Sequence, residues 1–150
     1  MIQDKVLWIE HRATMAGHGY EVKYDFVNSP AGTPECNQIY TDQEGILESP
    51  NYPDKYPANA MCQTIIVVPP GNTIQLNFRG FRLEDAYYGG CPYDKLVVVD
   101  YIAAEGPKTK SYCGLQEQMI WDSGSNVIQL NFVSDSSDEY KGYRIKFKII

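Results

Sequence analysis

The sequence predicts an all-β protein, built as an antiparallel sandwich or barrel. Apolar and polar residues alternate with a period of two in several short runs, and turns rich in proline and glycine separate those runs. The strand-like runs are 62–68, 73–79, 93–100, 126–133 and 142–149. No helix-length pattern with a 3.6-residue period lies between them, which argues against a parallel α/β sheet. We expect residues 116–121 to form a short helical turn at most.

Composition narrows the class of function. Hydrophobic residues make up 43% of the 150 residues, enough for one core, and the net charge is −6. A nucleic-acid-binding protein would normally carry a basic stripe, and none is visible, so we expect no nucleic-acid partner. No run approaches the roughly 20 apolar residues that span a bilayer, so we expect no transmembrane segment. The first residues lack a continuous apolar stretch, so we do not expect them to be a signal peptide.

The chain has four cysteines, Cys36, Cys62, Cys91 and Cys113. An even number suggests pairing, but four cysteines allow three connectivities. Sequential pairing would close two loops of similar size, each worth on the order of 3 kcal/mol in loop entropy. No C-x-x-C motif supports a zinc knuckle or a thioredoxin-like site. Four reduced thiols in a cytosolic protein remain the alternative at this point.

The first 27 residues echo the end of the chain. Residues 6–10 are similar to 127–131, and residues 19–24 are similar to 142–147. We interpret residues 1–27 as a repeat that is cut short and residues 28–35, with two prolines and a glycine, as a linker. Two strands alone are marginal in water. They would need to pack on the complete domain or on another chain, which allows self-association; a hairpin that belongs to the main fold is the alternative.

Residues 36–150 closely resemble the CUB domain family. The matching motifs are Cys36, GILESPNYPDKYP at 45–57, Cys62, FRLE at 81–84, CPYDKL at 91–96, YCG at 112–114, FVSDS at 132–136 and KGY at 141–143. The resemblance implies a two-sheet antiparallel β-sandwich with two disulfides, Cys36–Cys62 and Cys91–Cys113. It also implies an extracellular location, secreted or on a surface protein, and a role in protein recognition. Residues 1–27 then resemble the C-terminal strand pair of a preceding CUB module.

The resemblance also implies a calcium site. The positions that hold the ion in the calcium-binding branch of the family correspond to Glu84, Asp94, Asp135, Asp138 and Ser136, the last through its carbonyl, and Tyr56 matches the tyrosine that hydrogen-bonds the acidic cluster. Calcium takes six to eight oxygen ligands, whereas magnesium prefers a tight octahedron and is the less suitable ion. Carboxylates gathered without Lys or Arg need a cation or a proton. Asp85 could compete with Glu84, and solvated acidic loops without metal are the alternative.

The predicted function is therefore recognition of an extracellular or cell-surface protein. A Lys or Arg of the partner would pair with Glu84, Asp94 and Asp135 at the calcium-stabilised edge, beside Tyr87 and Tyr88. The alternatives are a carbohydrate-binding module and a non-catalytic spacer within a larger secreted protease or receptor.

We do not expect an enzyme. The sequence lacks the H-E-x-x-H and G-x-S-x-G motifs, and its only histidines are His11 and His18. A glycosidase pair of Glu84 and Asp94 is conceivable, but calcium ligation accounts for the same residues together with Asp135.

Overall fold

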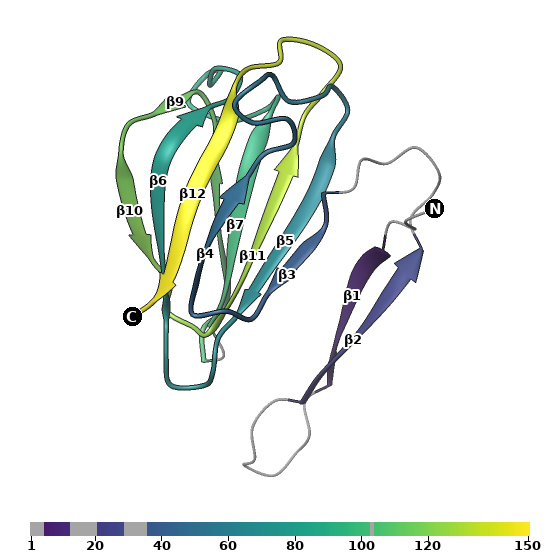
Figure 1. The fold of residues 1–150 in the computed structure, drawn as a ribbon, viewed down its shortest axis with the longest axis vertical. Coiled ribbons are helices and arrows are strands. Elements are labelled where there is room, and N and C mark those ends of the chain that lie inside the picture. Colours follow the sequence, from purple (N-terminus) through teal and green to yellow (C-terminus); the bar gives the residue numbers. More distant parts are fainter. Residues whose placement is uncertain (1–4, 13–20, 29–35, 103) are drawn as a thin grey trace.

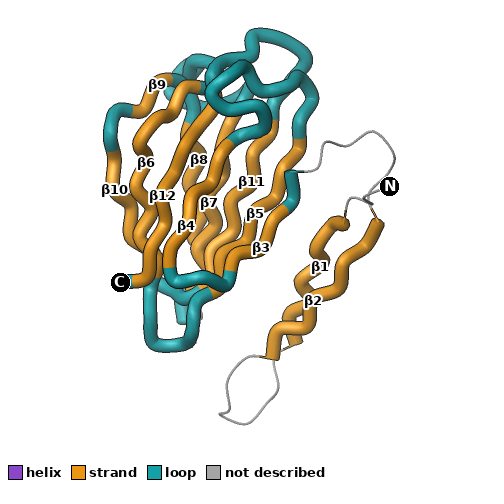
Figure 2. The backbone as a smooth tube through the Cα atoms, viewed as in Figure 1, coloured by secondary structure: helices purple, strands orange, loops and turns teal. Residues whose placement is uncertain are grey.

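Two five-stranded sheets pack face to face in the computed structural model (Figure 1). The structure describes residues 5–12, 21–28, 36–102 and 104–150, with the backbone alone for 5–12 and 21–28. Throughout this part every regular element is a strand (Figure 2). The described residues include no helix long and apolar enough to cross a membrane. The predicted all-β sandwich is thus confirmed.

The sandwich strands run in chain order as β3 (Gln38–Tyr40), β4 (Glu44–Glu48), β5 (Met61–Val67), β6 (Ile74–Arg82), β7 (Lys95–Ile102), β8 (Gly106–Tyr112), β9 (Leu115–Gln116), β10 (Met119–Asp122), β11 (Val127–Val133) and β12 (Gly142–Ile149). One sheet has the order β10-β6-β12-β4, with β9 also paired to β6, and the other has the order β3-β5-β11-β7-β8. Within the sandwich every pair is antiparallel except β3 with β5, which is parallel.

The core lies between the two sheets, as the period-two alternation requires. Along β6 the inward side chains are fully buried, and the same holds for β11 on the facing sheet. The exposed fraction is at most 2% for Ile74, Leu76, Phe78, Ile128, Leu130 and Phe132. Because successive side chains of a strand point to opposite faces, these runs could pack in only one register.

The expectation of a short helical turn at 116–121 is wrong. This segment contributes to β9 and forms most of β10, and both strands pair with β6. Met119 lies opposite Phe78 and Trp121 opposite Leu76, and both pack against the core. β6 offers this segment backbone hydrogen-bond partners and an apolar surface. These tertiary contacts outweigh a weak local helix propensity.

The N-terminal strands form a hairpin. β1 (Lys5–Arg12) pairs antiparallel with β2 (Glu21–Asn28), and these two strands make a sheet of their own. Asn28 ends β2, and the rest of the predicted linker lies outside the described residues. The side chains of residues 1–27, which were expected to pack on the complete domain or on another chain, are also outside the described residues. The origin of residues 1–27 in a preceding module stays a prediction.

Both implied disulfides are present. Cys36–Cys62 ties the start of β3 to β5, and Cys91–Cys113 ties the segment before β7 to the end of β8. The second bridge holds the β6–β7 loop, which carries two of the three central acidic residues.

Candidate functional site

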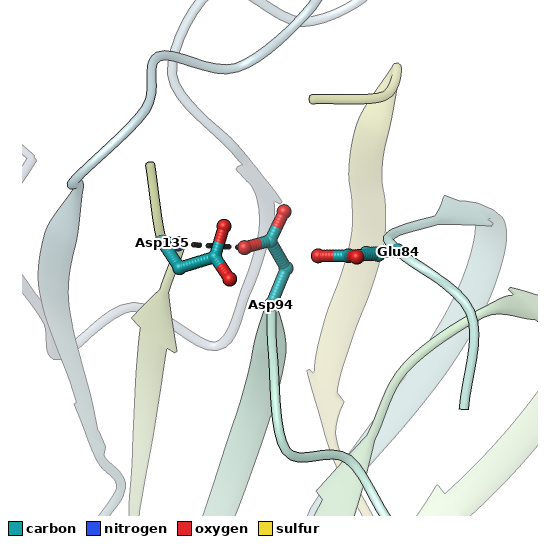
Figure 3. A group of neighbouring side chains, drawn as sticks. All are labelled: Glu84, Asp94 and Asp135. Carbon is teal, nitrogen blue, oxygen red and sulfur yellow. Dashed lines mark hydrogen bonds between the residues drawn. The ribbon is translucent and has the colours of Figure 1, made fainter. Parts of the chain in front are cut away.

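Three strand ends bring three carboxylates together at one end of the sandwich, the upper end in Figure 1. Glu84 follows β6, Asp94 immediately precedes β7, and Asp135 follows β11. β7 and β11 are antiparallel neighbours, with Lys95 opposite Val133, so the start of one meets the end of the other. One carboxylate oxygen from each of the three acids lies within 4.8 Å of the others (Figure 3). We call Glu84, Asp94 and Asp135 the acidic trio.

Asp94 is the buried centre of the trio, with only 1% of its surface exposed. Its Oδ2 accepts a hydrogen bond of 2.5 Å from the Tyr56 hydroxyl, and its Oδ1 accepts one of 2.7 Å from the backbone N–H of Asp135 (Figure 3 for the latter). Burial raises the pKa of Asp94, and the negative charges of Asp135 and Glu139 raise it further, against the effect of the two hydrogen bonds. Each oxygen of Asp94 therefore accepts a hydrogen bond from within the domain.

Glu84 is less well satisfied. Its Oε2 is buried and has no hydrogen-bond partner among the described residues. Burial raises the pKa of Glu84, and the nearby charges of Asp135, Asp94 and Asp138 raise it further, against the effect of a hydrogen bond from the backbone of Asp94. A buried polar atom without a partner is rare and costs free energy. The oxygen is thus available to a ligand.

The neighbouring cations do not satisfy the trio. Among the described residues, no ion pair includes a member of it. Asp85 does not compete for the site, because it turns to Arg82 and makes two bonds of 2.5 and 3.1 Å with the guanidinium. The described Lys and Arg side chains thus leave the carboxylates of the trio without a neutralising partner.

The oxygen spacing suits calcium. Calcium binds oxygen at about 2.3–2.6 Å, so two ligand oxygens on opposite sides of the ion are roughly 4.6–5.2 Å apart. Oxygens that all lie within 4.8 Å of one another can therefore share one calcium ion. The donors are carboxylates, which hard cations prefer. The residues present thus fit the ion that the resemblance implies.

The remaining predicted ligands lie on the β11–β12 loop. Ser136 and Asp138 are exposed, and Asp138 is not part of the trio, although its charge raises the pKa of Glu84. Asp138 has a φ of 62°. Asp135 begins this loop and accepts a bond of 3.0 Å from the backbone N–H of Ser137. This hydrogen bond fixes the start of the loop near Asp135, and Ser136 and Asp138 present further oxygen atoms to solvent.

Sequence reasoning missed Ser134, which supports the site. Its hydroxyl accepts a hydrogen bond of 2.8 Å from the N–H of Ala60 and donates one of 2.7 Å to the carbonyl of Pro57. The N–H of Asn59 donates to the carbonyl of Asp135 at 2.7 Å. These bonds fasten the loop before β5 to the end of β11. Every second side chain of β11 faces the core. Extending this alternation past the end of the strand places Ser134 on the same inner face, so the sequence could have identified it.

Tyr87 and Tyr88 lie on the same loop as Glu84 and Asp94. Both are exposed, at the tip of a tight turn closed by two backbone bonds between Tyr87 and Gly90, of 3.0 and 3.1 Å. Tyr93, which sequence reasoning did not select, is exposed beside them.

Comparison with known proteins assigns the fold to a family. Residues 36–147 match the family model described as CUB domain. Neuropilin-1 of Homo sapiens is 32% identical over 138 residues, which cover 89% of this chain and 15% of that protein. Adhesion G-protein coupled receptor G6 of Danio rerio is 37% identical over 114 residues, covering 75% of this chain and 9% of the receptor. The chain thus spans a small part of the relatives it matches.

Solved structures agree with this assignment. The MASP-1 CUB2 domain bound to Ca2+ is 30% identical with a TM-score of 0.66, and the match covers 74% of this chain and 96% of that domain. The full extracellular region of zebrafish Gpr126/Adgrg6 is 36% identical with a TM-score of 0.69, over 77% of this chain and 15% of that region.

These matches settle the broad class of function. CUB domains are non-catalytic interaction modules and lie in the extracellular regions of such proteins, which confirms the predicted extracellular location and the prediction that the chain is not an enzyme. With its family match, its sandwich and both disulfides, the chain belongs to the CUB domain family.

Proposed function

We propose that residues 36–150 form a recognition module that binds calcium and then offers an acidic edge to a basic side chain of an extracellular partner. The buried, unpartnered Oε2 of Glu84 is the observation that carries the proposal. This oxygen lies near two more carboxylates, and none of the three acids pairs with a described Lys or Arg. A cation is the ligand that best satisfies such an oxygen.

The calcium ligands in this proposal are Glu84, Asp94 and Asp135, completed by Asp138, the Ser136 carbonyl and water. The ion would neutralise three neighbouring carboxylates and link the β6–β7 loop to the β11–β12 loop. Tyr56 and the Asp135 N–H already orient Asp94, so little rearrangement is needed there. The solved CUB2 domain of MASP-1 with bound Ca2+ supports the choice of ion.

The partner in this proposal is a protein that presents Lys or Arg. The ligand carboxylates have oxygens to spare beyond the metal, and a charge-assisted hydrogen bond to an ammonium or guanidinium is stronger than a neutral one. Tyr87 and Tyr88 lie on the same loop as Glu84 and Asp94 and supply exposed aromatic surface, which is common at binding hot spots. The net charge of −6 favours approach of a basic surface.

Thermal unfolding tests the metal site. Extracellular calcium modules bind with Kd of about 10⁻⁴–10⁻³ M, so calcium at roughly 10–100 times Kd should stabilise the fold by about 1.4–2.7 kcal/mol. We expect the wild type to melt several degrees higher in calcium than in chelator, and Glu84→Gln and Asp135→Ala to lose this difference while remaining folded. Glu105→Gln makes the same change of charge at an exposed residue of the β7–β8 turn and should respond as the wild type does. A wild-type melting curve that ignores calcium would refute the site.

Partner capture tests the acidic edge. The chain is used to capture proteins from extracellular fluid or a cell surface, once in calcium and once in chelator. We expect a partner that is retained in calcium, released by chelator and lost with Glu84→Gln but not with Glu105→Gln. Capture that is equal in chelator would mean that the contact lies elsewhere on the domain.

A further inference from the structure

Three tyrosines of the β6–β7 loop form an exposed aromatic surface. The exposed fractions are 53% for Tyr87, 93% for Tyr88 and 39% for Tyr93. The rings of Tyr87 and Tyr88 meet edge to face with centroids 4.3 Å apart, and those of Tyr87 and Tyr93 lie 6.2 Å apart. We call these three residues the tyrosine ridge. Tyr93 directly precedes Asp94, so the ridge shares the β6–β7 loop with two members of the trio, Glu84 and Asp94.

Backbone hydrogen bonds and a disulfide fasten the loop that carries the ridge. The backbone bonds between Tyr87 and Gly90 close the turn, and Cys91 is bridged to Cys113. The N–H of Gly114 donates to the carbonyl of Glu84 at 2.7 Å, which fixes the start of the loop. A surface that is ordered before binding loses less entropy on contact with a partner.

The backbone at Tyr88 points to an external role for its side chain. Its φ is 49°, in the left-handed region that bulky residues seldom adopt, and the next residue, Gly89, has a φ of 77°. Asn followed by Gly is the usual choice for two such positions. With 93% of its surface exposed, Tyr88 contributes almost nothing to the core that could offset this strain. Its ring is therefore better explained by contact with another molecule than by the stability of the fold.

Arg82, which lies two residues before Glu84, is already engaged. Arg82 pairs with Asp85 and lies over the ring of Tyr140, with the guanidinium carbon 4.4 Å from the ring centroid. Among the described residues no ion pair includes a member of the trio, and the ridge adjoins it in the chain through Tyr93 and Asp94.

We propose that the tyrosine ridge holds an aromatic or bulky apolar side chain that lies next to the Lys or Arg bound by the trio. The preferred ligand is then a protein segment in which a basic residue is flanked by an aromatic residue, rather than any exposed Lys. This inference rests on the proposed function, since the basic residue must enter the trio for its neighbour to reach the ridge. An aromatic pair is worth about 0.5–1.5 kcal/mol beyond its buried area, and hence roughly a three- to tenfold gain in affinity.

Capped tripeptides test the proposal. The wild type in calcium is titrated, by NMR, with acetylated and amidated Phe-Lys-Phe, Ala-Lys-Ala and Phe-norleucine-Phe. We expect Phe-Lys-Phe to bind about three- to tenfold more tightly than Ala-Lys-Ala and to shift the ring signals of the ridge. Phe-norleucine-Phe, which has no charge, should bind most weakly.

The variant Tyr88→Asn separates the ridge from the rest of the site. It should remove the preference for Phe-Lys-Phe while leaving calcium affinity and the binding of Ala-Lys-Ala unchanged. Because Asn tolerates a positive φ better than Tyr, its melting temperature should be equal or higher, which excludes unfolding as the cause. Tyr101→Asn, at an exposed tyrosine at the far end of β7, should keep the preference.

The outcomes distinguish the two proposals. Equal binding of Phe-Lys-Phe and Ala-Lys-Ala, both above the norleucine peptide, would refute the ridge and leave the proposed function in place. Binding of both lysine peptides no better than that of the norleucine peptide would refute the basic-residue site and the ridge with it. A preference that survives Tyr88→Asn would also refute the ridge.

Discussion

Removal of the Tyr56 hydroxyl should destabilise the domain markedly, even in the absence of calcium. This hydroxyl donates to Asp94 at 2.5 Å, and both residues are 1% exposed. In Tyr56→Phe one oxygen of a buried carboxylate loses its donor, and no water reaches it easily. A hydrogen bond to a charged group contributes about 1.5–3 kcal/mol. For a domain of this size, 1 kcal/mol corresponds to roughly 4 °C in melting temperature, so we expect a fall of about 6–12 °C.

The assay is thermal unfolding in chelator, followed by circular dichroism or calorimetry. Tyr112→Phe provides a matched control, because Tyr112 is 4% exposed but its hydroxyl is buried without a hydrogen-bond partner among the described residues. Loss of an unsatisfied hydroxyl should be neutral or stabilising. If Tyr56→Phe melts within a degree of the wild type, or no lower than Tyr112→Phe, then the bond to Asp94 does not hold the site together.

Two further predictions concern charge and shape. Burial and like charges raise the pKa of Glu84 and Asp94 in the folded protein, so in chelator their contribution to stability is full below the ordinary carboxyl pKa and is lost as the pH rises through the raised values. The wild type should therefore lose stability relative to Glu84→Gln as the pH rises, and a difference between the two that does not change with pH would contradict this. At Gly142, which has a φ of 87°, an added Cβ would lie 1.8 Å from the Ser49 Oγ, so Gly142→Ala should cost more than about 2 kcal/mol in urea unfolding. Gly71 has a φ of 90° and open space around it, so Gly71→Ala measures the backbone strain alone, and an equal loss in both variants would rule out the clash.

Most of the sandwich could be predicted from local pattern. The alternation in β6, β11 and β12 is a property of each strand by itself, because it reports which face meets the core. The edge strand β8 was missed, since five of its seven side chains are exposed and carry no alternation. It exists because β7 offers it a backbone ladder, and that partner is known only once the sheet is assembled.

The site was predicted only in part, for a similar reason. The resemblance selected all three acids of the trio, together with Tyr56, which the structure places on Asp94. It could not tell that Asp85 would turn to Arg82, because that depends on where the guanidinium lies after folding. Nor could it select Tyr93, whose ring meets Tyr87 only after the loop is closed by Cys91–Cys113.

The amino-acid sequence by itself determined the all-β class, the alternating core and the supply of carboxylates and tyrosines between β6 and β7. Only the tertiary structure decided that Glu84 has a buried oxygen without a partner among the described residues and that the tyrosines of the same loop are exposed. The physical reason is the separation of the residues along the chain. The alternation concerns neighbouring residues of one strand, whereas the distance between the ends of different strands depends on how the two sheets pack. That packing buries Asp94 and the Glu84 Oε2 and brings oxygens of the three acids within 4.8 Å of one another.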